Sequence, residues 1–524
     1  MSETYVINRS LPEMFAETVA NYTHNIAIQY GENNITFAEL DILADKVAAE
    51  LVQNNIQKGD RIALYCVNSD AFAVAYLGIV KAGATVLPIN LLLTPIEIEY
   101  ILKDSRASGI IYHATFAQNI NVLRNSVATL KMYICIGDKP SVSSDIDWKT
   151  LLENTHVSPT IRFQPDVDLV AIIYTSGTTG KPKGVMLTHT NLASNTTSVR
   201  LALKIEPAKD KLLVVLPMFH AFAATVGMLT PLLHGASLMV VEKFNLESVF
   251  SAIDRSKASI FLGVPSMYNL MLRASVQQQK KFASIKYCVS GGAAMPVELM
   301  YKFENQFGVP IYEGDGPTEC SPVTCINPIG GKKKIASVGL PIPGVKMKIK
   351  DNKGNDLALN TIGEICVRGP NVMKGYWERP AATSESYFAD WFRTGDLGTE
   401  DSDGYFYIVD RIKDMIIVNG MNVYPRVIEE VLYQYPSVVE VAIVGEPNNL
   451  HGEIVIAYVV LKPESDEDPL LLRNFCRERL GQHQIPKKFN FLQMLPKNAA
   501  GKVLKRELRL HGELERGIDA RSAS

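Results

Sequence analysis

Apolar residues recur with two different spacings along much of the chain. Residues 36–52 place apolar side chains three or four positions apart, which predicts an amphipathic helix. Residues 61–66 form a short apolar run typical of a buried strand, and residues 71–81 predict a buried helix. Further apolar runs that predict strands occur at 169–173, 212–216, 238–241, 260–262 and 287–289. Strands and helices that alternate in this way favour a mostly parallel α/β sheet.

The pattern changes twice toward the carboxyl end. Beyond about residue 335, short β-type runs at 345–349 and 363–367 stand among turn residues, which predicts a small β-subdomain. From about Asp410, β-type runs at 439–444 and 454–461 mix with amphipathic helices, as in a compact α+β domain. The most apolar stretch, residues 72–93, is interrupted by Lys81, Gly83 and Pro88. It therefore predicts a helix, a turn and a strand within a core rather than a membrane span.

Composition changes this picture little. The chain has 524 residues, enough for several domains, of which 47% are hydrophobic and 21% charged. The formal net charge of -2 gives no reason to expect nucleic acid as a partner. Seven scattered cysteines without a CxxC pair, and N-terminal residues without an apolar signal segment, indicate reduced thiols in a cytoplasmic protein.

Candidate chemistry begins at residues 174–184, YTSGTTGKPKG, directly after a predicted strand. This segment combines three glycines, four Ser/Thr hydroxyls and two lysines. Glycines let backbone N–H groups approach a ligand, hydroxyls add donors and lysines add positive charge, so the segment predicts a phosphate-binding loop. The GxxxxGK[ST] spacing of a P-loop is absent, and an ordinary solvated turn is the alternative.

Four other segments carry weaker signals. Residues 311–319, IYEGDGPTE, end a predicted strand in a glycine-rich turn, and a carboxylate beside such a turn can hold Mg²⁺ over phosphates. An aspartate in FRTGDL, residues 392–397, can accept hydrogen bonds from ribose hydroxyls. PKNAAGKVLKR at 496–506 can deliver a lysine on a loop, and DRIKD occupies 410–414. Each segment alone is equally consistent with an ordinary turn or a surface lysine.

In this order, the segments resemble the motifs of the AMP-forming adenylating superfamily, which includes acyl-CoA synthetases, peptide-synthetase adenylation domains and luciferases. The resemblance also rests on LPMFHAF at 216–222 and NGMNVYP at 419–425, and it extends over nearly the whole chain from ITFAEL at 35–40 and KAGATVLPIN at 81–90. It implies an α/β fold, with a large N-terminal domain, residues 1–411, of two packed α/β subdomains plus a small β-barrel. A mobile α+β C-terminal lid domain, residues 412–524, is implied to follow.

The resemblance also implies a reaction and the residues that serve it. In the family, a carboxylate attacks the α-phosphate of MgATP to give an acyl-adenylate and pyrophosphate, and a thiol then displaces AMP. The implied contacts to the β- and γ-phosphates are Thr175, Ser176, Gly177, Thr178, Thr179, Gly180 and Lys183. Thr318 is implied to contact the α-phosphate, Glu319 to hold Mg²⁺, and Asp396 with Arg411 to bind the ribose. Lys502 is implied to lie between the substrate carboxylate and the α-phosphate. The other implied residues of the cofactor site are Gly292, Glu313, Gly314 and Asp315.

Three further positions follow from the resemblance. Lys413 is the family's hinge, about which the lid rotates between the half-reactions. Gly420 lies on the segment that then lines the pantetheine tunnel. Asp315 departs from the family, which commonly has an aromatic residue there that stacks on adenine. An aspartate cannot stack, but it can accept a hydrogen bond from the adenine amino group.

The implied acyl pocket indicates the substrate class. Residues 216–233 contain no acidic residue, whereas peptide-synthetase domains generally pair the substrate's amino group with an acid there. SGGAAMP at 290–296 adds small residues beside the acyl chain, and His220 takes the place of the family's aromatic gate. An uncharged apolar slot favours an aliphatic acid. We therefore predict a ligase that joins a medium- or long-chain fatty acid to coenzyme A with MgATP.

Two alternatives stay open at this point. The acceptor thiol can instead be the phosphopantetheine of an acyl carrier protein. A non-catalytic relative that only binds acyl or adenylate ligands is a third class, but such a relative is expected to have lost a charged catalytic residue, and Glu319, Asp396 and Lys502 are all present. Neither the oligomeric state nor the acyl chain length follows from the sequence.

Overall fold

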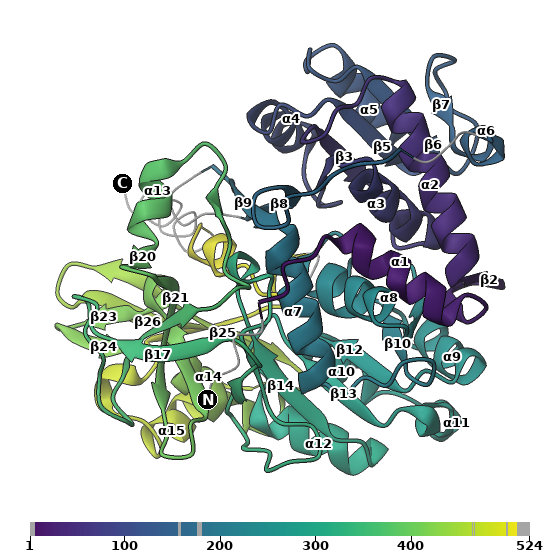
Figure 1. The fold of residues 1–524 in the computed structure, drawn as a ribbon. Coiled ribbons are helices and arrows are strands. Elements are labelled where there is room, and N and C mark those ends of the chain that lie inside the picture. Colours follow the sequence, from purple (N-terminus) through teal and green to yellow (C-terminus); the bar gives the residue numbers. More distant parts are fainter. Residues whose placement is uncertain are drawn as a thin grey trace.

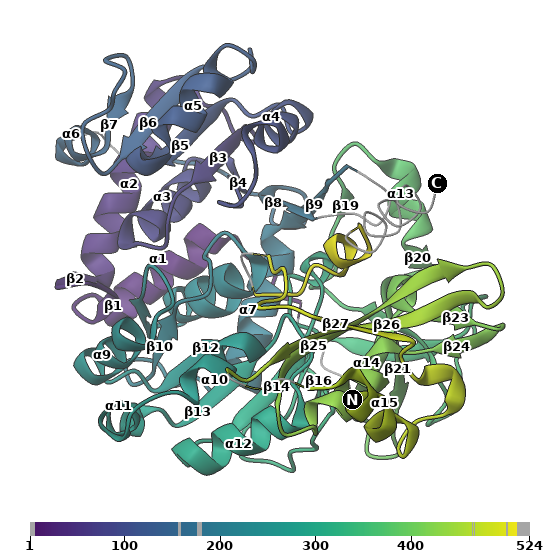
Figure 2. The ribbon, with the colours of Figure 1, turned by 180° about the vertical axis from the view of Figure 1, so that it is seen from behind.

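The computed structural model describes residues 6–155, 159–175, 181–463, 465, 467–498 and 501–510. Within these residues, three sheets belong to a large N-terminal part and a fourth belongs to a small C-terminal part (Figure 1). Seen from behind, the C-terminal part lies beside the third sheet and near the end of the second (Figure 2). The large and small parts agree with the predicted α/β organisation.

The first sheet is mixed, with eight strands in the order β19-β9-β8-β4-β3-β5-β6-β7. Its strands are β3 (Arg61–Tyr65), β4 (Thr85–Pro88), β5 (Gly109–His113), β6 (Met132–Ile136), β7 (Ile146–Asp147), β8 (Leu169–Thr175), β9 (Lys183–Thr188) and β19 (Gly375–Tyr376). The helices in this region are α2 (Phe37–Gln53), α3 (Asp70–Lys81), α4 (Pro95–Asp104), α5 (Ala117–Arg124) and α6 (Trp148–Glu153). Strands β4, β3, β5 and β6 are parallel, whereas β8 and β9 form an antiparallel hairpin.

The second sheet has nine strands in the order β16-β15-β14-β13-β12-β10-β11-β1-β2. Its strands are β1 (Ile26–Tyr30), β2 (Asn33–Thr36), β10 (Lys211–Val214), β11 (Ser237–Val240), β12 (Ile260–Gly263), β13 (Tyr287–Ser290), β14 (Ile311–Asp315), β15 (Cys325–Ile326) and β16 (Leu340–Pro341). The associated helices are α1 (Leu11–Tyr22), α7 (His189–Ala202), a π-helix (Ala223–Leu229), α8 (Thr230–Leu233), α9 (Leu246–Ser256), α10 (Pro265–Met271), α11 (Val276–Lys281) and α12 (Val297–Phe307). The strands from β1 to β14 along this order are parallel, as the alternating pattern predicts.

Helix α2 shows how local sequence sets an element. Thr36 caps its first turn by accepting a hydrogen bond from the Glu39 backbone N–H, and the Glu39 carboxylate accepts one from the Thr36 N–H at 2.8 Å. This capping box satisfies two of the backbone donors that a helix start leaves unpaired. On its apolar face, Phe37, Leu40 and Val47 are fully buried, and Leu43 is partly buried. The helix predicted at 36–52 is therefore confirmed, displaced by one residue.

Apolar side chains of α1, α2 and α3 join the first two sheets into one core. Phe15 and Phe37 lie with ring centroids 6.5 Å apart, and Phe72 of α3 is fully buried in the same cluster. Fully burying a side chain of this size stabilises the fold by roughly 1.5–3 kcal/mol. The stretch 72–93 predicted as helix, turn and strand forms most of α3 and all of β4. Among the residues that the structure describes, no helix is long and apolar enough to cross a membrane.

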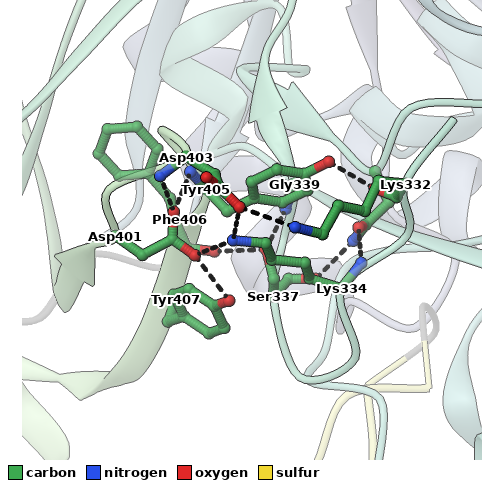
Figure 3. Close-up of polar contacts among 10 residues, drawn as sticks. Lys332, Lys334, Ser337, Gly339, Asp401, Asp403, Tyr405, Phe406 and Tyr407 are labelled. Atoms are coloured by element: carbon green, nitrogen blue, oxygen red, sulfur yellow. Dashed lines mark hydrogen bonds and ion pairs between the residues drawn. The ribbon is translucent and has the colours of Figure 1, made fainter.

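The third sheet is the small β-unit predicted beyond residue 335. Its strands are β17 (Lys346–Lys350), β18 (Gly363–Arg368), β20 (Tyr387–Phe388), β21 (Trp391–Glu400) and β22 (Phe406–Arg411), accompanied by α13 (Pro380–Glu385). A polar cluster ties the β21–β22 turn to the segment before β16 (Figure 3). The Asp401 carboxylate accepts hydrogen bonds from Lys334 at 2.5 Å and from the Tyr407 hydroxyl at 3.0 Å, and Ser337 donates to the Phe406 carbonyl at 3.0 Å. These contacts hold the β21–β22 hairpin against the second sheet.

The C-terminal part contains the fourth sheet. Its strands are β23 (Ile416–Val418), β24 (Met421–Val423), β25 (Val438–Asn448), β26 (Gly452–Leu461) and β27 (Lys488–Phe491), and its helices are α14 (Pro425–Tyr433) and α15 (Pro469–Arg477). Helix α14 docks on the large part, because Glu430 accepts a hydrogen bond from the Val297 N–H at 3.4 Å and Arg426 donates to the Ile408 carbonyl at 2.8 Å. The boundary predicted at residue 411 falls where β22 ends and a 3-10 turn, Ile412–Asp414, begins.

Candidate active site

The carboxyl ends of central strands in the second sheet border a cavity. Strands β12, β13 and β14 are parallel, so the turns that follow β13 and β14 meet at one edge. Ligands of parallel sheets bind at this edge. The cavity lies against α7 and the π-helix. Five predicted site residues line it, namely His220, Gly292, Gly314, Asp315 and Thr318.

The turn after β14 is shaped by close backbone approach. A Cβ atom added at Gly316 would lie 1.7 Å from the carbonyl oxygen of Pro322. No side chain fits there, so glycine is required for the turn to fold back on itself. Thr318 and Glu319 follow in a single 3-10 turn, Thr318–Cys320, which places Thr318 on the cavity wall.

Most of the cavity wall is apolar. Val199, Ala202 and Leu203 contribute from the carboxyl end of α7, and Val226 of the π-helix and Val289 of β13 face the same space. Asp315 is the only acidic residue on the cavity wall among the residues that the structure describes. The cavity wall is therefore mostly apolar, with polar side chains that include His220, Asp315 and Thr318.

His220 lies on this wall as a neutral ring. Burial lowers its pKa to about 4, and the positive charge of Lys502 acts in the same direction. Its Nδ1 accepts a hydrogen bond from the Phe222 N–H at 3.4 Å. An uncharged imidazole at the rim can pack against an acyl chain without adding a charge to the apolar space.

Glu319 and Lys183 meet at Tyr376. The Tyr376 hydroxyl donates to Glu319 Oε1 at 2.9 Å, and Lys183 Nζ lies 5.0 Å from the centroid of the Tyr376 ring. Lys183 begins β9 and pairs with Thr175 at the end of β8. The predicted phosphate contacts Ser176, Gly177, Thr178, Thr179 and Gly180 lie outside the described residues.

Asp396 and Arg411 form an ion pair on neighbouring strands. They are register partners in the β21–β22 hairpin, and Arg411 Nε lies 2.7 Å from Asp396 Oδ1. The Asp396 charge raises the pKa of Arg411, so the guanidinium stays protonated. Lys413 follows in the 3-10 turn and lies beside Asp414 and Arg509, which are paired at 2.9 Å.

Lys502 reaches the same region from the C-terminal part. Its backbone N–H donates to Asn498 Oδ1 at 2.9 Å, which shapes the loop that carries it. Burial lowers the pKa of Lys502 to about 8, and the positive charge of Arg411 acts in the same direction, while Asp396 opposes both. An added Cβ at neighbouring Gly501 would lie 2.8 Å from the Ser266 hydroxyl of α10, so the loop is packed against the large part. The fold thus brings Lys502 to Asp396 and Arg411 from far along the chain.

Two carboxylates, the buried Glu313 and the half-buried Asp315, distinguish the end of β14. Glu313 is 2% exposed and accepts a hydrogen bond from the Met295 N–H at 3.0 Å, with Arg426 of the C-terminal part 4.0 Å away. Burial raises the pKa of Glu313 to about 7. Burial and the nearby Asp396 charge also raise the pKa of Asp315. Unlike Asp315, Glu313 does not line the cavity.

Gly420 lies apart from these residues. It occupies the exposed turn between β23 and β24, and no atom lies within 4 Å of a Cβ added to it. The arrangement in the structure therefore places Lys502 near His220, Asp396 and Arg411 and leaves Gly420 in solvent.

Sequence reasoning missed several residues of the site. Tyr376, Arg426 and the α7 residues Val199, Ala202 and Leu203 were not predicted to contribute. The α7 residues carry no signal beyond ordinary helical burial. Tyr376 stands in the sequence GYW, and its aromatic side chain could have been noticed there. Its partner Glu319 lies 57 positions away, and no sequence pattern links the two.

Comparison with known proteins agrees with this geometry. The AMP-binding enzyme family matches residues 15–377, and the AMP-binding enzyme C-terminal domain family matches residues 427–502. A long-chain-fatty-acid–CoA ligase of Bacillus subtilis (strain 168) is 36% identical over 527 residues, covering 96% of this chain and 94% of the relative. A feruloyl-CoA synthase of an Amycolatopsis species is 33% identical, covering 93% of this chain and 96% of the relative.

Solved structures show the same architecture. ATP-bound MatB from Rhodopseudomonas palustris superposes with a TM-score of 0.88 at 30% identity, covering 96% of this chain and 99% of that one. The predicted α/β fold and the predicted resemblance to adenylating enzymes are confirmed. The two family models together match most of the chain, and the relatives described above align along nearly all of it. The chain therefore belongs to the AMP-binding enzyme family.

Proposed function

We propose that the protein activates an unbranched medium- or long-chain fatty acid with MgATP and transfers the acyl group to the thiol of coenzyme A. The observation that carries the proposal is the mostly apolar wall of the cavity, on which Thr318, Asp315 and His220 are polar. An aliphatic chain gains from leaving water in such a space, whereas an ammonium group buried against the apolar side chains of the wall would find no acidic partner among them. The names of the fatty-acid ligase relatives point to the same class of acid.

The first half-reaction brings two anions together, and the chain supplies positive charge for it. A carboxylate oxygen attacks the α-phosphorus of ATP while the bond to the bridging oxygen of pyrophosphate breaks. We assign Lys502 to the substrate carboxylate and the α-phosphate, Thr318 to the α-phosphate and Lys183 to the outer phosphates. Donors and cations fixed in advance at such a site lower the barrier, because they need not reorganise as charge develops.

The remaining nucleotide contacts are part of the same proposal. We assign Asp396, which is paired with Arg411, to accept hydrogen bonds from the ribose hydroxyls. Among the described residues, no group of three or more His, Cys, Asp or Glu side chains could hold a metal ion. We assign Mg²⁺ to Glu319, because proteins commonly bind this ion through one or two carboxylates plus substrate phosphates. When bound, Mg²⁺ would neutralise phosphate charge.

The second half-reaction is assigned to a different placement of the C-terminal part. The thiol sulfur attacks the acyl carbon, loses its proton, and AMP leaves. We propose that residues 412–524 rotate against residues 1–411 near Lys413, and that Gly420 then lines the path of the pantetheine arm. The exposed position of Gly420 and the buried position of Lys502 are consistent with the arrangement for the first step.

A ladder of straight-chain acids tests the substrate class. We expect kcat/KM for pyrophosphate release to rise from butyrate to longer acids by roughly threefold or more per added methylene, because each buried CH₂ contributes about 0.8 kcal/mol. Beyond the pocket length, kcat/KM should level off or fall. Leucine, phenylalanine and ferulate complete the panel. The proposal would be contradicted if kcat/KM did not change with chain length, or if an amino acid or ferulate were the best substrate.

A helix variant links the ladder to the cavity. Ala202→Phe fills the α7 wall and should move the preferred acid to a shorter chain. Leu201→Phe is the matched control, because the neighbouring Leu201 side chain is 42% exposed and lies outside the cavity. Gly292→Leu is a poorer choice, since Gly292 has φ +77° and a larger residue would be strained there. Parallel assays with coenzyme A and a holo acyl carrier protein identify the acceptor.

A further inference from the structure

A short segment of the large part, residues 373–379, connects Glu319 with the predicted phosphate loop. We call it the strap. The Met373 N–H donates to the Glu319 carbonyl at 2.7 Å, and the Trp377 N–H donates to the Gly184 carbonyl at 2.7 Å. Between them, β19 pairs antiparallel with β9, with Tyr376 opposite Val185. The strap's main chain is therefore bonded both to the turn that carries Glu319 and to the strand that carries Lys183.

Tyr376 of the strap contacts both of these charged side chains. Its hydroxyl donates to Glu319 Oε1 at 2.9 Å, and Lys183 Nζ lies 5.0 Å from its ring centroid. A cation at this distance from an aromatic face is attracted to it. Among the described residues, the hydrogen bond to the Glu319 carboxylate comes from Tyr376 and is made to Oε1, not to Oε2. One oxygen is thus oriented by Tyr376, and the other is available to a cation.

The far end of the strap is anchored at Asp104 of α4. Arg379 Nη2 lies 2.6 Å from Asp104 Oδ1, and Trp377 Nε1 donates to the Asp104 carbonyl at 3.1 Å. The Tyr174 hydroxyl donates to Asp104 Oδ2 at 2.6 Å. Tyr174 directly precedes Thr175, the first predicted phosphate contact. Asp104 therefore fixes the strap and the stem of the loop to the same point, which restricts the positions open to Tyr376.

We propose that Tyr376 is a positioning residue that sets Glu319 and Lys183 relative to each other for Mg²⁺ and the outer phosphates of ATP. This inference rests on the proposed function, since it concerns the same nucleotide. A carboxylate held by a charge-assisted hydrogen bond presents its free oxygen in one direction, which matters because Mg²⁺ requires near-ideal octahedral geometry. The ring contact holds the ammonium group of Lys183 at the aromatic ring whose hydroxyl orients that carboxylate.

Calorimetric binding of ATP to the full chain without any acid tests this role. One titration contains excess MgCl₂ and the other contains EDTA. Tyr376→Phe removes the hydroxyl and keeps the ring. Because a hydrogen bond to a charged group is lost, we expect the affinity for MgATP to fall roughly tenfold. The affinity for metal-free ATP should stay at the wild-type value. Tyr376→Leu also removes the ring and should weaken both titrations. In steady-state assays, Tyr376→Phe should raise the Mg²⁺ concentration needed for half-maximal pyrophosphate release by a similar factor.

Tyr387→Phe is the matched control. The Tyr387 hydroxyl donates to the Met373 carbonyl of the same strap at 3.2 Å, and the described contacts place no hydrogen bond between it and Glu319. This variant should keep the wild-type difference between the two titrations. The proposal would be overturned if Tyr376→Phe kept the wild-type difference in ATP affinity between the two titrations. It would also be overturned if this variant lost the same ATP affinity with and without Mg²⁺. If no acid in the panel releases pyrophosphate, the proposed function fails, but the calorimetric comparison still decides the role of Tyr376.

Discussion

At the scale of single residues, the site depends on charges that are buried together. Lys502 carries a pKa lowered to about 8 by burial and by the nearby cation Arg411. Near neutral pH it is still mostly protonated, and a poorly solvated cation gains more from an approaching anion than a solvated one does. Asp396 and Asp315 oppose the lowering of this pKa, so the lysine stays charged in a confined site.

Lys502→Ala should separate the two half-reactions. We expect adenylate formation, measured as pyrophosphate release from acid and ATP, to fall by about 10²–10³-fold, equivalent to about 2.7–4 kcal/mol. Thioester formation from supplied acyl-AMP should change little, because no anion has to approach the phosphate in that step. Lys497→Ala is the control, since Lys497 lies on the same loop but pairs with Glu440. Equal losses in both half-reactions would show that Lys502 has another role.

At the scale of elements, the geometry of the β23–β24 hairpin by itself explains why a glycine stands at position 420. Val418 pairs with Met421, so the turn consists of Asn419 and Gly420 alone. Both have positive φ, 51° and 78°. This is the geometry of a type I′ turn, for which Asn-Gly is strongly preferred. Substitution at Gly420 therefore tests backbone strain as well as the proposed pantetheine path.

Comparing Gly420→Leu with Gly420→Asn separates the two effects. Leucine strains the turn by about 1–2 kcal/mol, whereas asparagine adopts positive φ more readily and still adds a side chain. If Gly420 lines the thiol path, both variants should lower thioester yield by roughly tenfold or more, corresponding to at least about 1.4 kcal/mol, and both should spare pyrophosphate release. Wild-type thioester yield in Gly420→Asn would assign the glycine to the turn alone. Loss of pyrophosphate release would contradict both interpretations.

At the scale of the whole molecule, Arg426 and Glu430 of α14 make polar contacts with the large part. Arg426 Nη2 lies 4.0 Å from the buried Glu313, and Glu430 accepts a hydrogen bond from the Val297 N–H. The pKa of Glu313, raised to about 7 by burial, is lowered in part by Arg426. Without Arg426, this pKa would rise further, and the ionised carboxylate would disfavour the docked arrangement that places Lys502 in the site.

Arg426→Ala should therefore impair the first half-reaction in a pH-dependent way. At pH 8, Glu313 is ionised in the wild type, and we expect pyrophosphate release to fall roughly three- to tenfold, about 1 kcal/mol. At pH 6, below the pKa of Glu313, the carboxyl is mostly protonated in both proteins, so the loss should be smaller. Arg426→Lys, which keeps a positive charge, should behave closer to the wild type. An equal loss at both pH values would rule out the electrostatic explanation.

Much of the site could be predicted from the sequence because its parts are local. The run at 169–173 followed by glycines, hydroxyls and lysines predicts a strand and a phosphate loop from periodicity and turn chemistry. The glycines at 311–319 likewise indicate a turn in which two stretches of backbone approach each other closely, as they do at Gly316. Resemblance of the ordered motifs then indicated the family, which the comparisons confirm.

Only the tertiary structure decided which separated segments meet. It brings Tyr376 to Glu319, Arg426 to Glu313, and the end of α7 to the wall of the cavity. It also pairs β8 and β9 in antiparallel orientation within a largely parallel sheet. Sequence patterns report the spacing of apolar residues and the demands of single turns, which depend on near neighbours in the chain. Contacts between distant residues depend on how sheets and helices pack, and that packing is a property of the whole chain rather than of any segment.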